Sequence, residues 1–180
     1  MEEPTQIPAD EPVKAGGFAS QVSGNQVQFE AGLAQSVTAQ EDLSMTRSLA
    51  LVAQAGNNMQ VTDSLTLACI AGKDAAVSNA GAQLIVSGGN VELTNGGAQF
   101  MVVGGDAHIN KGGAQVVVAG ADASVNNGFV GIILSTKTIL GEGSRVLLDT
   151  PQAIAFGAAM GIVSALVSWL LKRRRDHHHG

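Results

Sequence analysis

The feature that most constrains this chain is an internal repeat of sixteen residues. Three segments that begin at Val77, Leu93 and Ile109 align without gaps and read VSNAGAQLIV, LTNGGAQFMV and INKGGAQVVV. The register extends back to Val13 and forward to Leu140, which makes eight units of 16 residues. Helical repeats need units of roughly 33–47 residues. A period of sixteen instead predicts one coil of a β-solenoid for each unit.

Each unit divides into a longer side, such as residues 98–103, and a shorter side, such as residues 106–109, with glycine-rich turns between them. Side chains alternate between the two faces of a strand, so one set on the longer side should point inward. We expect three inward rows there, which are Ala82, Ala98 and Ala114, then Leu84, Phe100 and Val116, then Val86, Val102 and Val118. The predicted fold is therefore all-β, a parallel β-helix of about eight 16-residue coils over residues 13–150.

Composition agrees with a core of small and β-branched side chains. Aromatic residues are 3 % of the chain, tyrosine is absent, and glycine accounts for 23 of 180 residues. A formal net charge of −5 argues against a nucleic-acid partner. The single cysteine, Cys69, excludes an internal disulfide framework, and the register predicts that it points outward.

The repeat resembles that of a known family. The strings Gly105-Asp106-Ala107-His108-Ile109, Gly113-Ala114-Gln115-Val116 and Gly120-Ala121-Asp122 are similar to the glycine–aspartate–apolar and glycine–alanine–x–apolar rhythm of bactofilins. This resemblance covers residues 56–140 and implies a β-helix core and a polymer-forming cytoskeletal role. The strict 16-residue coil and the hydrophobic segment after it depart from the family pattern.

The two ends of the chain differ from the repeat. Residues 1–12 hold three prolines and four acidic residues, which predicts a disordered tail. Residues 153–171 carry no charge and as a helix would be about 28 Å long, close to the ~30 Å hydrocarbon core of a bilayer. We therefore predict a transmembrane helix over 151–172 and a basic, histidine-containing tail over 173–180. A buried helix that caps the solenoid is the alternative.

The residues that flank and line this predicted helix support a single membrane pass. Trp169 lies near its end, where indoles favour the membrane interface, and four basic residues follow it, which are Lys172, Arg173, Arg174 and Arg175. Gly157, Gly161 and Ala165 fall four apart on one face, a spacing that lets a second helix approach closely.

The side of the membrane on which the solenoid lies is open. The basic residues after the helix favour a cytoplasmic C-terminus and an extracytoplasmic solenoid. The chain begins with no basic and apolar signal peptide, which favours a solenoid that stays in the cytoplasm. We expect the cytoplasmic arrangement.

The sequence contains no recognisable catalytic motif, so we expect no enzyme and no cofactor. HExxH, GxSxG, CxxC and P-loop patterns are absent, and His108 is the only histidine outside the terminal run His177–His179. One row of turn residues has two interpretations, and its members are Asn58, Asp74, Asn90, Asp106 and Asp122. These side chains bond nearby backbone at corners, or Asp106 and Asp122 share a Ca²⁺ ion.

The most informative feature for function is an absence of charge on the longer side. None of its eight six-residue segments, from residues 18–23 to residues 130–135, contains a charged residue. By the alternation above, we expect an outward self-association face that consists of Gln83, Ile85, Gln99, Met101, Gln115, Val117 and Ile133. A soluble monomer seldom exposes a large apolar patch. The chain's own tail or terminal helix, a second solenoid, another protein and the membrane are the candidate partners of this face.

These features predict a membrane-anchored structural scaffold that self-associates laterally into a lattice or filament. Its partners would be copies of itself, the lipid bilayer and another membrane protein. The alternative is an accessory subunit or surface adhesin that binds one specific protein through the uncharged face or the acidic N-terminal tail.

Overall fold

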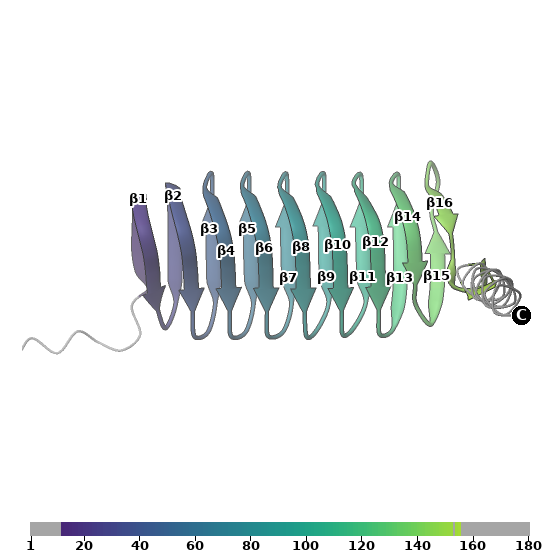
Figure 1. The fold of residues 1–180 in the computed structure, drawn as a ribbon, viewed down its shortest axis with the longest axis horizontal. Coiled ribbons are helices and arrows are strands. Elements are labelled where there is room, and N and C mark those ends of the chain that lie inside the picture. Colours follow the sequence, from purple (N-terminus) through teal and green to yellow (C-terminus); the bar gives the residue numbers. More distant parts are fainter. Residues whose placement is uncertain (1–11, 153, 156–180) are drawn as a thin grey trace, which may run out of the picture.

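The protein is a single stack of β-coils, as the predicted solenoid requires (Figure 1). The structure is a computed structural model that describes residues 12–152 and 154–155. About eight coils of sixteen residues follow one another along one axis, and all neighbouring strands are parallel. The prediction of an all-β parallel solenoid is therefore confirmed.

Sixteen strands build the stack, and they pair into one continuous sheet. The strands are β1 (Val13–Gly24), β2 (Val27–Ala39), β3 (Leu43–Thr46), β4 (Leu49–Ala55), β5 (Met59–Thr62), β6 (Leu65–Ala71), β7 (Ala75–Ser78), β8 (Gly81–Ser87), β9 (Val91–Thr94), β10 (Gly97–Val103), β11 (Ala107–Asn110), β12 (Gly113–Ala119), β13 (Asp122–Asn126), β14 (Phe129–Leu134), β15 (Lys137–Leu140) and β16 (Arg145–Leu148). Odd-numbered strands from β3 onward form the short side of the coil, and even-numbered strands from β4 onward form the long side. Strands β1 and β2 each run through both sides.

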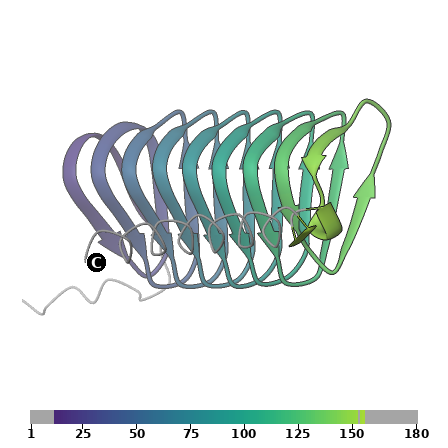
Figure 2. The same cartoon turned by 45° about the vertical axis from the view of Figure 1, so that its right-hand side comes forward.

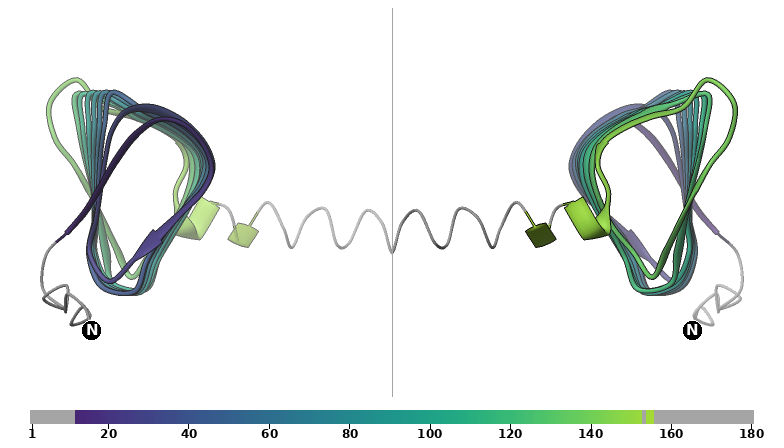
Figure 3. Two further views of the ribbon diagram at one scale, coloured as in Figure 1. Left: turned by 90° about the vertical axis from the view of Figure 1, so that its left-hand side faces the viewer. Right: turned by 90° about the vertical axis from the view of Figure 1, so that its right-hand side faces the viewer.

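The coils lie in constant register. Every pairing from β2 to β14 joins residues sixteen apart, as between Ala98 and Ala114 or between Leu93 and Ile109. Consecutive coils therefore follow at even spacing (Figure 2) and superpose closely when viewed down the axis (Figure 3). The last coil opens wider because four residues, 141–144, join β15 to β16 where two residues join the earlier pairs.

The long side is not straight, because each long strand bends at its third residue. In β10, Gly97 and Ala98 pair with the next coil, Gln99 does not, and pairing resumes at Phe100. Gln99 and Phe100 are both exposed, whereas Ala98 and Met101 are both buried. Two consecutive outward residues shift the alternation by one step, so side chains after the bend point the opposite way from a straight strand.

This bend overturns part of the predicted core. The alanine row of Ala82, Ala98 and Ala114 is buried as expected. The prediction that the two rows after the bend point inward is wrong: Phe100 is 48 % exposed, Val102 is 44 % exposed, and Leu84, Val86, Val116 and Val118 also face outward on the surface. The buried row is instead Val37, Ala53, Cys69, Ile85, Met101, Val117 and Ile133.

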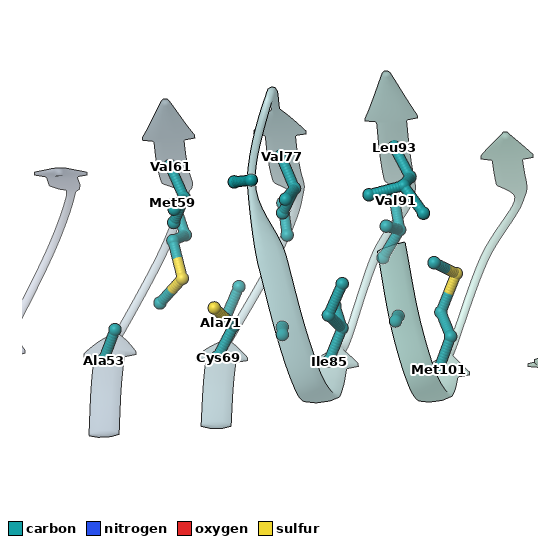
Figure 4. Close-up of a cluster of buried hydrophobic side chains, with 14 of the residues drawn as sticks. Ala53, Met59, Val61, Cys69, Ala71, Val77, Ile85, Val91, Leu93 and Met101 are labelled. Carbon is teal, nitrogen blue, oxygen red and sulfur yellow. The ribbon is translucent and has the colours of Figure 1, made fainter. Parts of the chain in front are cut away.

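Side-chain volume is matched across the core. The early long strands contribute small residues, Ala53 and Cys69, and the short side places Met59 toward them (Figure 4). The later long strands contribute Ile85 and Met101, and there the short-side row that contains Met59 carries smaller residues, which are Ala75, Val91, Ala107 and Ala123. Large residues thus oppose small ones at successive levels, which keeps the interior filled.

Two rows of residues form the corners between the sides. The turn from the short side to the long side has one residue with φ near +50° in each coil, for example Asn95 and Lys111. At the opposite turn, Gly72, Gly88, Gly104 and Gly120 stack so closely that a Cβ on any of them would overlap the carbonyl oxygen of the glycine one coil below. The approach of the backbone therefore favours glycine at these four positions.

The reversed rows make a direct prediction. Met101→Asp should lose several kcal/mol of folding free energy because it buries a carboxylate without a partner, whereas Val102→Asp should leave the midpoint of thermal unfolding nearly unchanged. Circular dichroism of the full chain in detergent measures both midpoints. Equal loss in the two variants would contradict the bend.

The glycine corner makes a second prediction. Gly104→Ala should destabilise the protein by about 1–3 kcal/mol, because the added methyl group must displace a backbone carbonyl. Gly97→Ala is the matched control: the nearest atom to its Cβ is the Gly113 carbonyl oxygen at 4.0 Å. Chemical denaturation of both variants checks this, and similar stability in both would show that the corner has room to relax.

Candidate interaction surface

The outward surface of the long side beyond the bend is apolar. We call this surface the outer apolar strip, and it consists of Leu84, Phe100, Val116, Ile132, Val86, Val102, Val118 and Leu134. Consecutive members stack in register, as Leu84, Phe100 and Val116 do. Val52 and Ile70, which are 37 % and 36 % exposed, extend the strip onto β4 and β6.

The predicted self-association residues divide between the exposed bend of the long side and the core. Gln83, Gln99 and Gln115 are exposed, as expected. The prediction that Ile85, Met101, Val117 and Ile133 point outward is wrong, since each is at most 1 % exposed. The physical reason is the bend at Gln99 and its equivalents. Up to β14 the long side nevertheless stays uncharged, and its exposed residues are more apolar than those predicted.

A signal for this arrangement exists in the sequence. The row that contains Met101 holds no polar residue from Val37 to Ile133, as a core row requires. The row that contains Val102 includes Gln54 and Thr38, which suit an outward position. The composition of whole rows, rather than the alternation within one strand, therefore indicates that the Met101 row is buried and the Val102 row is exposed.

A second apolar region lies before the bend, and the sequence patterns above did not reveal it. The first residues of the long strands form the leucine–glycine row, which consists of Leu33, Leu49, Leu65, Gly81, Gly97 and Gly113. Its leucines are 41–60 % exposed. Beside them Leu51 and Leu67, at the bend, are also exposed. Leu49, Leu51, Leu65 and Leu67 border an open groove of about 510 Å³ that continues over Gly81 and Gly97.

The short side has the opposite character. Its two outward rows are mainly amides, hydroxyls and charged groups, which include Gln28, Gln60, Glu92, His108, Thr46, Thr62, Ser78 and Thr94. The solenoid is therefore amphipathic in cross-section, with a polar short side and a largely apolar long side that carries no charge up to β14. This contrast makes the long side the candidate interaction surface.

The row of Asp and Asn residues at the glycine corner bonds the backbone of the next coil. The Oδ1 atoms of Asp74, Asn90 and Asp106 accept hydrogen bonds from the backbone N–H groups sixteen residues later, at 2.7, 2.9 and 2.9 Å. Asp42 does the same toward Asn58 at 3.0 Å. This bonding is what the turn interpretation predicts. In the part of the chain that the structure describes, no three metal-ligating side chains of His, Cys, Asp or Glu are grouped.

The two isolated candidates for chemistry differ in their surroundings. His108 is exposed on the short side, and its Nδ1 atom lies 2.6 Å from the Ser124 hydroxyl. The prediction that Cys69 points outward is wrong, because it is 0 % exposed in the core row. Burial raises the pKa of the Cys69 thiol, and a hydrogen bond with Thr66 at 2.9 Å partly opposes that rise. The position needs a small apolar residue, as Ala53 shows one coil below.

Several predicted segments lie outside the described residues. These are the tail over 1–11, the helix-contact residues Gly157, Gly161 and Ala165, the membrane-flanking residues Trp169 and Lys172–Arg175, and the histidines at 177–179. Among the described residues, no helix has the length and apolar character needed to cross a membrane.

The Asp149 carboxylate accepts a hydrogen bond from the backbone N–H of Gln152 at 3.3 Å, as a residue at a helix N-terminus does.

Comparison with protein-family models, with curated proteins and with solved structures gives no match to this chain. The β-solenoid that the bactofilin resemblance implies is confirmed by the coils, and membership of that family remains a prediction.

Proposed function

We propose that this protein is a membrane-anchored structural scaffold whose solenoids associate side by side through the long side. The observation that carries the proposal is the outer apolar strip on a surface without charge. Phe100 and Val102 at its centre are nearly half exposed.

The size of this strip supports a role in association. Including Val52 and Ile70 it follows six strands from β4 to β14, a length of roughly 24 Å at the usual strand spacing. Soluble monomers rarely leave contiguous apolar patches of more than a few hundred Å² in water. The regular stacking of the strip also gives every coil the same outline, so two such strips can meet along their whole length.

The lack of charge on the long side removes the main obstacle to contact between identical surfaces. Identical charged residues placed opposite one another would repel, and burial would remove their hydration. On the polar short side, Glu92 would meet such costs. Association through the long side therefore costs less than association through the short side.

An anchor at residues 151–172 would strengthen weak contacts. The uncharged segment 153–171 is long enough to span a bilayer as a helix, and the basic residues after it would mark its end. Confinement to a membrane raises the effective concentration of the solenoids. We expect the solenoid to lie on the cytoplasmic side, and we expect a structural rather than a catalytic role, in line with the bactofilin resemblance.

The outer apolar strip gives the test of association. Val102→Lys combined with Val118→Lys should fold normally, because both positions are exposed and a lysine stem can lie along apolar surface. Association in native membranes should fall at least about tenfold, because like charges meet in the contact. Chemical cross-linking and electron microscopy of membranes that carry the full chain measure the loss.

The matched control places the same charges on the other side of the coil. Gln60→Lys combined with His108→Lys adds two lysines to exposed positions of the short side and should leave association unchanged. Normal assembly of the long-side variant would refute the scaffold role for this strip. A stoichiometric complex with an unlike chain, in place of self-assembly, would favour the accessory-subunit alternative.

The anchor is tested separately. The full chain should stay in the membrane pellet after extraction with alkaline carbonate, and a chain that ends at Gln152 should appear in the supernatant with the circular dichroism of a folded solenoid. If the shortened chain still sediments with protein-free lipid vesicles, a single C-terminal anchor is wrong.

A further inference from the structure

The leucine–glycine row has an unusual order. Its three leucines occupy consecutive coils on β2, β4 and β6, and its three glycines occupy the next coils on β8, β10 and β12. A phenylalanine flanks each half, Phe18 beside Leu33 and Phe129 beside Gly113, and Arg145 follows Phe129 in the last coil. One half of the row is therefore a ridge and the other half a notch.

The fold of one chain does not require glycine at the centre of this notch. A Cβ on Gly97 would meet only the Gly113 carbonyl oxygen at 4.0 Å, and the φ angle of Gly97 is one that any residue adopts. A Cβ on Gly81 would meet only the flexible end of the Leu65 side chain. Leucine and phenylalanine fill the same strand position elsewhere in the stack. Glycine inside a strand weakens it, and it often marks close approach of another backbone.

We propose that a second copy of this chain covers the leucine–glycine row in antiparallel orientation. A two-fold axis between Leu65 and Gly81 would place Leu65 of each copy over Gly81 of the other. The same axis places Leu49 over Gly97 and Leu33 over Gly113, because the coils are evenly spaced. Phe18 then meets Phe129 at each end of the interface, and aromatic pairs are favourable contacts.

The residues on both flanks of the row suit this orientation. On one flank, the positive-φ residues of one copy would face those of the other copy. The pairs across the interface would be Arg47 with Asn95, Asp63 with Asn79, and Lys111 with Ala31. None of these pairs brings like charges together. On the other flank Leu51 and Leu67 meet Gln99 and Gln83, whose methylene groups can cover them while their amides reach the rim.

A parallel pair would fit poorly. If the two-fold axis ran along the row, the leucines of one copy would lie on the leucines of the other, and the glycines would face glycines. The leucine side chains would then overlap, and the facing glycines would leave a void that forfeits packing contacts. The shape of the row therefore selects the antiparallel pair.

The area of the proposed antiparallel interface predicts a weak dimer. The strip from Phe18 to Phe129 is roughly 34 Å long and about five residues, or roughly 16 Å, wide at ordinary strand dimensions. Each copy would thus contribute roughly 540 Å², below the ~800 Å² per partner of a standard stable interface. We therefore expect the pair to form mainly on a membrane, which is the part of this inference that rests on the proposed function.

Cysteine cross-linking in membranes tests the register. The full chain carries Cys69→Ala, Leu49→Cys and Gly97→Cys, because alanine already occupies the position equivalent to residue 69 in the coil below. Residues 49 and 97 of one chain are three coils, or about 14 Å, apart, too far for a disulfide. Oxidation should therefore give a covalent dimer. Leu49→Cys alone should give none, because the two copies of residue 49 would also be about 14 Å apart.

A ridge-and-notch exchange provides the control for folding. Gly97→Leu alone should fold, since a Cβ there lies 4.0 Å from its nearest neighbour and leucine fills the equivalent position at residue 65. It should reduce dimerisation at least about tenfold because the added side chain would overlap the partner's Leu49. Leu49→Gly combined with Gly97→Leu restores a leucine opposite every glycine and should recover dimerisation. Energy transfer between labelled chains in lipid vesicles measures both.

Each other result overturns the inference in a recognisable way. A dimer from Leu49→Cys alone would show parallel packing, and failure of the exchange variant to recover would show that the row is not the contact. Association without the 49–97 cross-link would reject this pair and leave the scaffold proposal standing, whereas absence of any association would reject both. If the thiol of monomeric Leu49→Cys reacts with a water-soluble reagent only after residues 153–180 are removed, the chain's own C-terminal segment covers the row instead.

Discussion

Main-chain hydrogen bonds between neighbouring coils are the interaction on which every other feature of this solenoid depends. Even at the corners they continue, as when the amide of Gly97 donates to the carbonyl of Ala80 at 3.1 Å and that of Gly113 donates to Gly96 at 3.0 Å. Because partners always lie one coil apart, each side chain stacks on its equivalent in the next coil. A requirement at one position thereby becomes a requirement on a whole row, and rows rather than single residues carry the chemistry of the molecule.

This dependence on rows explains which features of the fold could be predicted from the sequence and which could not. The coil length, the parallel stack and the corner of Gly72, Gly88, Gly104 and Gly120 follow from periodicity alone, and the structure has all three. The bend at Gln99 does not follow from periodicity, since it repeats with the same period as everything else. Strict alternation carried across that bend reversed the rows of Met101 and Val102, and with them most of the apolar residues of the interaction surface.

The matched volumes of the core could not be foreseen for the same reason. Cys69 and Ala53 look out of place on an outward row, but opposite Met59 they are the small residues that let a large one fit. The predicted membrane segment and its flanking residues follow from hydropathy and charge, which do not depend on the bend. The leucine–glycine row was missed because the predicted long side began at Ala98 and its equivalents, and this row lies one residue before them.

The bend divides the long side into two apolar surfaces that face different directions. An isologous pair formed through the leucine–glycine row is closed, because a two-fold contact uses the same surface on both copies. Such a pair leaves the outer apolar strip of each copy free for further neighbours. Together the two proposed contacts would give a sheet-like assembly that neither contact gives by itself.

The constant offset of sixteen residues also bears on how such a chain can change in length. Duplication of one unit would add a single step of about 4.8 Å and keep every row continuous, so the fold itself places little restriction on coil number. The leucine–glycine row is more demanding, because in the proposed pair three leucines would oppose three glycines. A duplication in its leucine half would need a matching duplication in its glycine half, so a lineage that keeps the paired contact should gain or lose these coils two at a time.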